Sequence, residues 1–170
     1  LKGRYPGTPG SRAAAEYIRS QFRSSGLVLL DEDGFQDFEV VVDVKAGANN
    51  SFSIDGKPAV NTTDFVPFSF SKNATLATTV AFAGYGFEID QDSLKWNDYN
   101  GIDVTGKWVM ILRADPEYDK QESRYATYGD DRDKVLIARD KGAAGVIFVS
   151  GSKFDAGDEL VSMHFDKTQS

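Results

Sequence analysis

Residues 106–150 constrain the fold of this chain more than any other stretch. The apolar run Trp108–Leu112 opens them and residues 145–150 close them, and such runs are typical of strands buried on both faces of a sheet. Between these runs, residues 131–142 have acids in the first turn, a lysine near the end and Gly142 at the last position, which predicts a helix. A strand, a helix and a second strand joined by a short return predict a parallel crossover.

The composition limits the classes of protein to which the chain can belong. Its 170 residues are enough for one full core, or for one domain and a piece of another. With 41% hydrophobic residues, we expect a folded protein. The net charge of −7 argues against a nucleic-acid partner, because phosphate recognition needs a basic face. No apolar run approaches the length of a membrane span, and the first residues do not form a signal peptide, so we expect neither in this chain.

The N-terminal part predicts an amphipathic helix. Thr8 followed by Pro9 is a suitable N-cap and first-turn pair, and the helix is expected to run to about Ser25, with Gly26 ending it. An apolar stripe along this helix needs a partner surface. The stripe consists of Ala14, Ala15, Ile18 and Phe22.

The middle of the chain predicts short strands. Residues 35–44 alternate loosely and are interpreted as a strand, and residues 51–60 resemble a hairpin with its turn at Asp55 and Gly56. Apolar and polar residues also alternate in residues 66–70 and 76–82. Short strands separated by turn residues indicate a β-sandwich or a small barrel.

Several motifs resemble a known family. Residues 104–109 and 141–148 resemble a protease-associated domain, with a Gly-Lys turn into a buried strand and a helix that ends in Gly-Ala-x-Gly before the next strand. Residues 3–18 resemble the opening helix of secreted di-zinc aminopeptidases, in which a protease-associated domain is inserted after the first helix and strand. Residues 82–86 and 97–104 are similar to that inserted domain.

The resemblance implies a fold and a domain organisation. The fold would be α+β, a protease-associated β-sandwich or open barrel with flanking helices and one strand-helix-strand crossover. Residues 1–44 would be the N-terminal helix and strand of an incomplete peptidase domain, and residues 45–170 would be the protease-associated domain, truncated at its C-terminal end.

The resemblance also implies that this chain has a non-catalytic function. The domain would shape peptide access to a zinc site in the neighbouring peptidase domain, or make protein contacts, and the parent enzyme would be secreted or periplasmic. Its expected partners are the rest of the peptidase domain and a peptide substrate. The alternative is a stand-alone peptide-binding or protein-binding module unrelated to catalysis.

The residue types that zinc chemistry requires are scarce here. The chain has one histidine, His164, and no cysteine, while the zinc ligands and the general base of such peptidases lie downstream of the inserted domain. We therefore assign no catalytic residue, no metal ligand and no cofactor to this chain, and expect zinc only in the parent enzyme. His164 is interpreted as a residue of a polar tail.

The segment after the first buried strand is rich in acids, from Asp115 to Asp133. Carboxylates at this density are potential calcium ligands, but their spacing does not match the D-x-D-x-D-G loop, so we interpret them as a solvated loop. Tyr118, Tyr125 and Tyr128 lie in the same long segment, where binding residues tend to gather, and are candidate peptide contacts. The alternative is that these aromatic side chains fill a core.

Two further features leave alternatives open. Asn49, Asn61 and Asn73 each begin an Asn-x-Ser/Thr triplet, which is either a chance pattern or a glycan acceptor in a eukaryotic secretory pathway. The polar end of the chain carries no late apolar strand, which suggests an exposed sheet edge that pairs with a second copy as a homodimer.

The scarcity of zinc ligands gives a first prediction. The purified chain, supplied with zinc, is expected to release no amino acid from a peptide with a free amino terminus, because one imidazole and no thiolate cannot hold two catalytic zinc ions. Amine release and zinc retention after dialysis are the measurements. Tightly held zinc together with peptide turnover would contradict the expectation.

Overall fold

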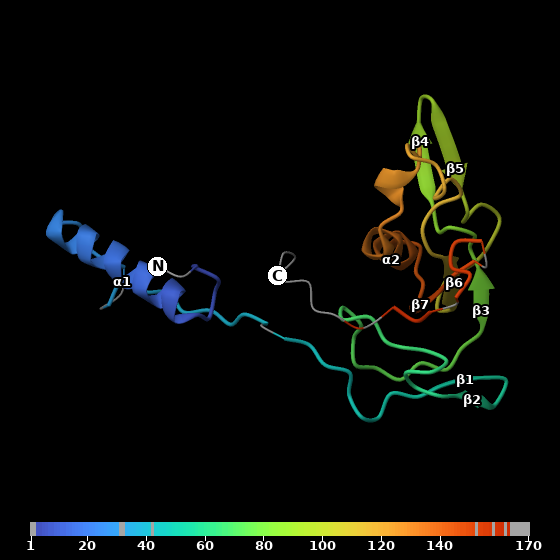
Figure 1. Cartoon of the computed structure of the whole chain (residues 1–170), viewed down its shortest axis with the longest axis horizontal. Coiled ribbons are helices and arrows are strands. Elements are labelled where there is room, and N and C mark those ends of the chain that lie inside the picture. The colour runs from blue at the N-terminus through green and yellow to red at the C-terminus, as the bar shows by residue number, and fades with distance from the viewer. Residues whose placement is uncertain are drawn as a thin grey trace. The chain divides into compact units, whose positions relative to one another are not determined.

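A computed structural model describes residues 3–30, 33–41, 43–151, 153–157, 159–161 and 163 (Figure 1). These residues divide into two compact units, one formed by the described parts of residues 1–71 and 161–170 and the other by residues 72–160. We call the second the 72–160 unit. The predicted domain boundary between residues 44 and 45 is not tested by this division and stays a prediction.

The N-terminal helix, α1, spans Pro9–Ser24 and confirms the predicted start and end signals. The Thr8 hydroxyl accepts a hydrogen bond from the backbone N–H of Ser11 at 3.3 Å, and Pro9 supplies no orphaned amide. Gly26 has a φ of 75°, and its N–H donates to the Arg23 carbonyl, while the N–H of Leu27 donates to Phe22. This pair of bonds is a Schellman motif, and it closes the helix.

The apolar stripe of α1 is exposed. No residue of the helix is buried, and Ile18 and Phe22 keep 50% and 47% of their surface accessible. The guanidinium groups of Arg12 and Arg19 lie over the Phe35 ring, 4.3 and 4.4 Å from its centroid. The stripe therefore offers an uncovered apolar face.

The strand predicted for residues 35–44 is absent from the described residues of that segment. Phe38 and Val41 are 75% and 59% exposed. A strand forms only where a neighbouring segment accepts and donates its backbone hydrogen bonds, and alternation of apolar residues cannot supply that neighbour. Here Asp43 accepts from the N–H of Val44 in place of a partner strand.

The predicted hairpin is confirmed. β1 spans Phe52–Ile54, β2 spans Lys57–Ala59, and the two pair antiparallel. Asp55 and Gly56 have φ values of 50° and 76°, as the two central residues of a tight hairpin turn require. The strand predicted for residues 66–70 does not form.

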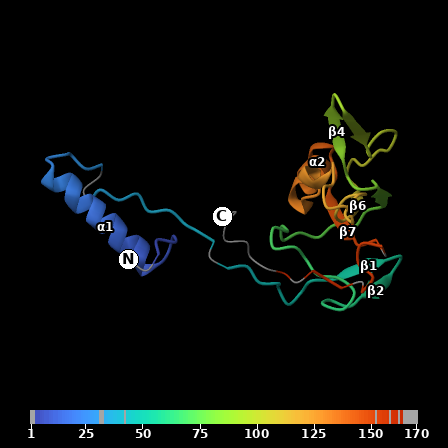
Figure 2. The ribbon, with the colours of Figure 1, turned by 45° about the horizontal axis from the view of Figure 1, so that its top comes forward.

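A three-stranded parallel sheet forms the centre of the 72–160 unit and confirms the predicted crossover. β3 spans Val80–Phe82, β6 spans Trp108–Leu112 and β7 spans Gly145–Val149, in the order β3-β6-β7. The helix α2, Asp131–Asp140, connects β6 to β7, and both pairings are parallel. In two views α2 lies beside the β6–β7 pair (Figure 1 and Figure 2).

The core lies between this sheet and α2. Val109 and Ile111 of β6 have no exposed surface, and neither does Ala138 of α2. The remaining residues of β6 are half-buried, and so are all five residues of β7. The sequence predicted burial on both faces of these strands, and the structure instead buries one face of β6 completely and the other in part.

A second hairpin was not predicted from the sequence. β4 spans Glu88–Gln91 and β5 spans Leu94–Asn97, and they pair antiparallel. Gly84 and Gly86, with φ values of 47° and 70°, turn the chain from β3 into this hairpin. The Asp98 carboxylate secures the turn by accepting hydrogen bonds, each 3.0 Å long, from the backbone N–H groups of Tyr85 and Phe87.

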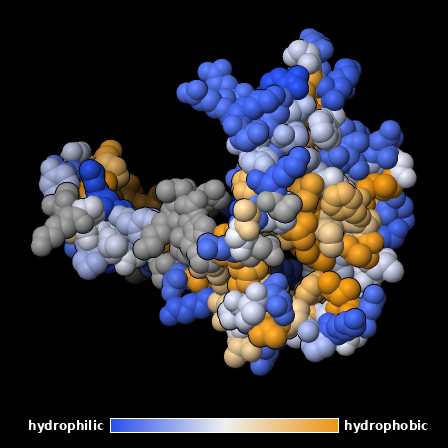
Figure 3. All heavy atoms as spheres, turned by 45° about the vertical axis from the view of Figure 1, so that its right-hand side comes forward, coloured by the Kyte–Doolittle hydropathy of each residue, from blue (hydrophilic) through white to orange (hydrophobic). Residues whose placement is uncertain are grey.

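The structure confirms a mixed α+β fold, and the β-sandwich or open barrel stays a prediction. The described strands form a two-stranded, a three-stranded and another two-stranded sheet. Apolar side chains also reach the surface, as one face shows (Figure 3), and Val80 and Phe82 of β3 are among the exposed ones. Pairing of an exposed sheet edge with a second copy stays a prediction as well. No helix in the described ranges has the length and apolar character needed to cross a membrane.

Burial in the core predicts unequal effects of one substitution at two valines. Val109→Ala removes methyl groups from a fully buried site and is expected to lower the free energy of unfolding by roughly 2–3 kcal/mol. Val80→Ala, at a site that is 52% exposed, is the matched control and should change it by less than about 0.5 kcal/mol. Urea unfolding of both variants measures the difference, and equal losses would contradict the position of the core.

Candidate functional site

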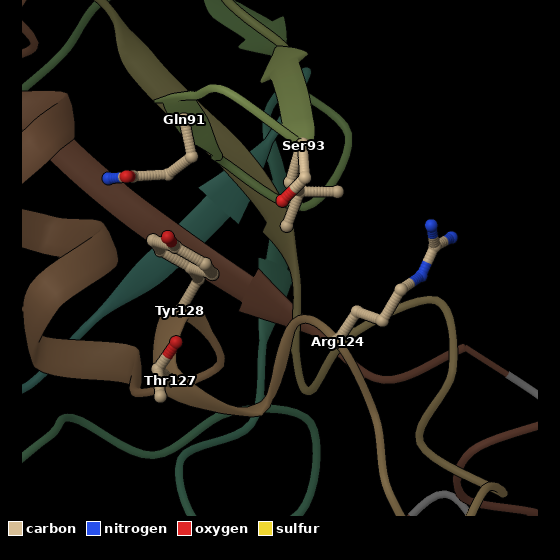
Figure 4. A pocket seen from close by; sticks show the side chains of 6 residues that line it. Gln91, Ser93, Arg124, Thr127 and Tyr128 are labelled. Atoms are coloured by element: carbon tan, nitrogen blue, oxygen red, sulfur yellow. The ribbon is translucent and has the colours of Figure 1, made fainter.

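An open pocket lies where the β4–β5 hairpin faces the segment between β6 and α2. Its volume is ≈ 690 Å³. The short 3₁₀ helix η1, Ala126–Tyr128, forms the opposite side (Figure 4). The lining residues are Gln91, Ser93, Leu94, Arg124, Thr127 and Tyr128.

An aromatic cluster supports the pocket from beneath. Phe87 and Tyr125 stack with their ring centroids 5.9 Å apart and an angle of 15° between the rings. Trp96 of β5 meets Tyr125 edge-on at 5.4 Å, and Tyr128 lies 6.3 Å from Phe87. Such ring contacts add to the burial of apolar area, so they hold η1 against the hairpin.

The acidic segment is not a solvated loop throughout, which corrects the sequence-based interpretation. Asp115 and Glu117 are only 7% and 9% exposed. Asp115 Oδ1 accepts hydrogen bonds from the Glu117 N–H at 2.7 Å and from the Ser123 hydroxyl at 2.8 Å. Buried carboxylates must find donors, and these donors fold the segment back on itself.

Glu117 accepts three further hydrogen bonds within the acidic segment. Its Oε1 accepts from Lys120 Nζ at 2.7 Å and from Arg124 Nη2 at 3.2 Å, and its Oε2 accepts from the Arg124 N–H at 3.2 Å. The hydrogen bond from Lys120, followed by that from the Arg124 backbone, lowers the pKa of Glu117 to about 2. The carboxylate is therefore charged at neutral pH, and it fixes Arg124, which lies just before η1.

A buried lysine joins this segment to the sheet. Lys134 of α2 has no exposed surface, and its Nζ donates to the carbonyl oxygens of Leu112 and Ala114 at 3.0 and 2.5 Å. The ammonium also lies 5.1 Å from the centroid of the Phe87 ring and 5.8 Å from that of Tyr85. Desolvation by burial lowers the pKa of Lys134 to about 8.

A half-buried ion pair also joins the end of β6 to α2. Arg113, directly after β6, contacts Asp131 in the first turn of α2 through Nε at 2.9 Å and through Nη2 at 2.8 Å. Both side chains are mostly covered, and Asp131 lies where a helix dipole favours negative charge. The Asp130 side chain caps the helix by accepting from the N–H groups of Arg132 and Asp133.

The structure brings two of the three candidate tyrosines together. Tyr128 is half-buried and lines the pocket, whereas Tyr125 is 5% exposed and lies beneath it, in the aromatic cluster. Tyr118 is half-buried elsewhere in the 72–160 unit and meets Phe154 edge-on at 5.4 Å. Of the three, only Tyr128 lines the pocket, and peptide contact by any of them stays a prediction.

Most of the polar groups that line the pocket are neutral, and Arg124 is its charged residue. Hydroxyl groups of Ser93 and Thr127 and the amide of Gln91 line it beside the Tyr128 ring (Figure 4). The Arg124 guanidinium points away from these groups and is held by Glu117 (Figure 4). Hydroxyl and amide groups donate and accept hydrogen bonds, so the lining suits peptide amides and neutral side chains.

No group of three or more His, Cys, Asp or Glu side chains within the described residues is arranged to hold a metal ion. This finding does not extend to His164, which lies outside the described residues. Asp115 and Glu117 of the acidic segment already accept hydrogen bonds from protein donors.

The comparison with protein families decides the family. Residues 63–168 match the PA domain, the protease-associated domain. The chain belongs to the PA domain family. The PA match includes the parallel sheet, α2 and the whole of the pocket, and it begins after the β1–β2 hairpin. No curated protein and no solved structure gave a significant match.

The hairpin side of the pocket was not predicted from the sequence, because no strand was expected at β4 or β5. This side consists of Gln91, Ser93 and Leu94. A signal was present, since Ile89, Leu94 and Trp96 are apolar and alternate with polar residues on both sides of the Asp92-Ser93 turn. The runs are only four residues long, and a two-stranded hairpin of that length needs packing partners that no local pattern reveals.

The burial of Lys134 predicts a pH effect on stability. An unfolded lysine has a pKa of 10.5, so between pH 8 and pH 10.5 the unfolded chain binds more protons than the folded one, and stability rises with pH. The expected rise is about 1 kcal/mol from pH 8 to pH 9. Urea unfolding at both pH values measures it, and the Lys134→Met variant should lack the rise.

Ionisation of Tyr99 does not contribute to the change in stability between pH 8 and pH 9. Burial raises the pKa of Tyr99 to about 12, so the folded chain holds that proton longer than the unfolded one and stability falls above pH 10. A wild-type rise that persists unchanged in folded Lys134→Met would contradict the assignment to Lys134.

Proposed function

We propose that this chain is the non-catalytic PA domain of a zinc-dependent aminopeptidase, preceded by the first helix of the peptidase domain, and that it shapes peptide access to the zinc site. The observation that carries the proposal is the PA match over residues 63–168. The resemblance of residues 3–18 to the opening helix of such peptidases supports the choice of parent enzyme.

The exposed stripe of α1 supports the same parent. Ile18 and Phe22 leave apolar surface uncovered on a helix that has no buried residue. An amphipathic helix gains most of its stability by packing its apolar face. The remainder of a peptidase domain would supply such a surface, so the helix fits the role of its first element.

The pocket supports a role in peptide binding. Its hydroxyl and amide groups match the donors and acceptors of an extended peptide, and Tyr128 adds an aromatic wall. The ion pairs of Glu117 and the ring contacts of Tyr125 hold η1 in place. A preorganised wall loses little conformational entropy on binding, which favours contact with an extended peptide.

Under this proposal the chemistry and the compartment belong to the parent enzyme. Zinc in the neighbouring domain would supply a bound hydroxide for attack on the first peptide bond, and this PA domain would contact the substrate beyond the bond that is cut. The parent would act outside the cell or in the periplasm.

A stand-alone binding module is the second candidate. The observation that favours it is the 72–160 unit, which has its own core around Val109 and Ile111 and contains the whole pocket. A unit of this kind can bind a peptide without a peptidase beside it. The two candidates differ in whether the full gene product releases amino acids.

The test compares long and short substrates in the full gene product. Thr127→Ala removes a pocket hydroxyl and is expected to raise KM for peptides of several residues about threefold to tenfold, the effect of one lost hydrogen bond. KM for a single amino-acid anilide should not change, because that substrate ends before the PA domain. Steady-state kinetics with both substrates separate the effects.

Thr105→Ala is the matched control, because Thr105 is an exposed threonine of the same unit that does not line the pocket. It should leave both KM values unchanged. An unchanged KM for long peptides in Thr127→Ala would refute the access role. A gene product that binds peptides but does not hydrolyse them would favour the stand-alone module.

A further inference from the structure

All Asn-x-Ser/Thr triplets of the chain fall in one segment. They begin at Asn49, Asn61 and Asn73, and none has proline at its middle position. The segment connects the N-terminal helix to the first strand of the parallel sheet. A glycan is bulky and needs a surface position, so the structure around each asparagine decides which triplets are usable.

Asn49 lies in a suitable environment. It is exposed, sits in a turn just before β1, and is followed by an exposed Ser51. The neighbouring Asn50 side chain donates to the Gly47 carbonyl at 2.8 Å and so stabilises the turn without using Asn49.

Asn73 is equally accessible. Residues 71–75 are all exposed, and the backbone from residue 71 to residue 79 forms no helix or strand. Within the described ranges, the Asn73 side chain makes no hydrogen bond that would have to break for a sugar to be attached.

Asn61 differs from both. Its Oδ1 is buried and has no hydrogen-bond partner among the described residues. The triplet is part of a closed turn, in which the Thr62 N–H donates to Phe65 and the Asp64 N–H donates to Val60, each at 2.8 Å. Asn61 forms a backbone bridge with Phe65, whose ring packs 5.7 Å from the Phe52 ring of β1, so the turn that carries Asn61 is held against the β1–β2 hairpin.

We propose that Asn49 and Asn73 are N-glycan attachment sites and that Asn61 is not. In the reaction, the side-chain amide nitrogen attacks the anomeric carbon of an oligosaccharide carried on a polyisoprenyl diphosphate. A nitrogen–carbon bond forms, the bond from that carbon to the diphosphate oxygen breaks, the lipid diphosphate leaves, and the amide loses one proton. A transferase of a secretory pathway supplies the activated donor.

The position of the two sites gives the glycans a use. Along the chain they flank a segment with exposed apolar side chains, Ile54, Val60 and Phe70. Hydrophilic sugars on either side of this segment keep exposed apolar surface in water and hinder association with other chains. This inference does not depend on the access role proposed for the pocket.

The experiment expresses the full chain behind a secretion signal in a eukaryotic cell. Peptide mapping before and after treatment with a peptide N-glycosidase in heavy-oxygen water identifies each occupied asparagine by its conversion to labelled aspartate. We expect label at Asn49 and Asn73 and none at Asn61. Asn49→Gln and Asn73→Gln should each lower the apparent mass of the chain on a gel by one glycan, and Asn61→Gln should leave it unchanged.

Two further variants separate glycan loss from misfolding. Thr75→Ala destroys the third triplet but keeps Asn73, and Thr75→Ser keeps the triplet, so only the first should lose the glycan. Absence of label at Asn49 and Asn73 in the secreted chain would overturn the proposal, and so would full occupancy of Asn61. If a variant is retained in the cell, the same peptide mapping is applied to the chain isolated from the membrane fraction and identifies its occupied asparagines.

Discussion

The buried side chain of Lys134 makes the hydrogen bonds on which the 72–160 unit depends. It donates to two carbonyl groups at the end of β6 from within α2, and it lies against the ring of Phe87. A buried charge must be matched by acceptors, and here the acceptors are the backbone groups that a strand leaves unpaired where it ends. One side chain thereby links the parallel sheet, the helix and the aromatic cluster.

The pocket follows from this link. Because the chain is fixed where it leaves β6 and again where it enters α2, the segment between them has to fold over the hairpin rather than extend into solvent. Glu117 and its two cationic partners set the shape of that segment, and the rings of Tyr125 and Tyr128 complete it. The wall that the PA domain would offer to a peptide is therefore built by ionic contacts within one loop and by aromatic contacts of that loop with Phe87 and Trp96.

The sequence predicted the elements whose signals are local. The crossover from β6 to β7 and both helices were predicted because apolar runs, caps and glycines act within a few residues. Signals that depend on distant contacts failed. Residues 35–44 alternate like a strand, but none of the described residues pairs with them, and β4 and β5 are too short to give a clear alternating pattern. The burial of Lys134 could not be predicted, since a lysine in a polar helix is normally exposed. The same limit applies to the candidate site, where Tyr128 was identified but Gln91, Ser93 and Leu94 were not.

Amide hydrogen exchange in folded Lys134→Met tests this account most directly. In the wild-type chain, the N–H groups of Lys120, Arg124 and Tyr128 are hydrogen-bonded within the segment that Lys134 holds. Removing the amine and its two hydrogen bonds should speed their exchange by at least about tenfold while leaving the α1 amides unchanged, because local opening follows the loss of the contact that prevents it. Unchanged exchange of these amides in a folded variant would contradict the central role of Lys134.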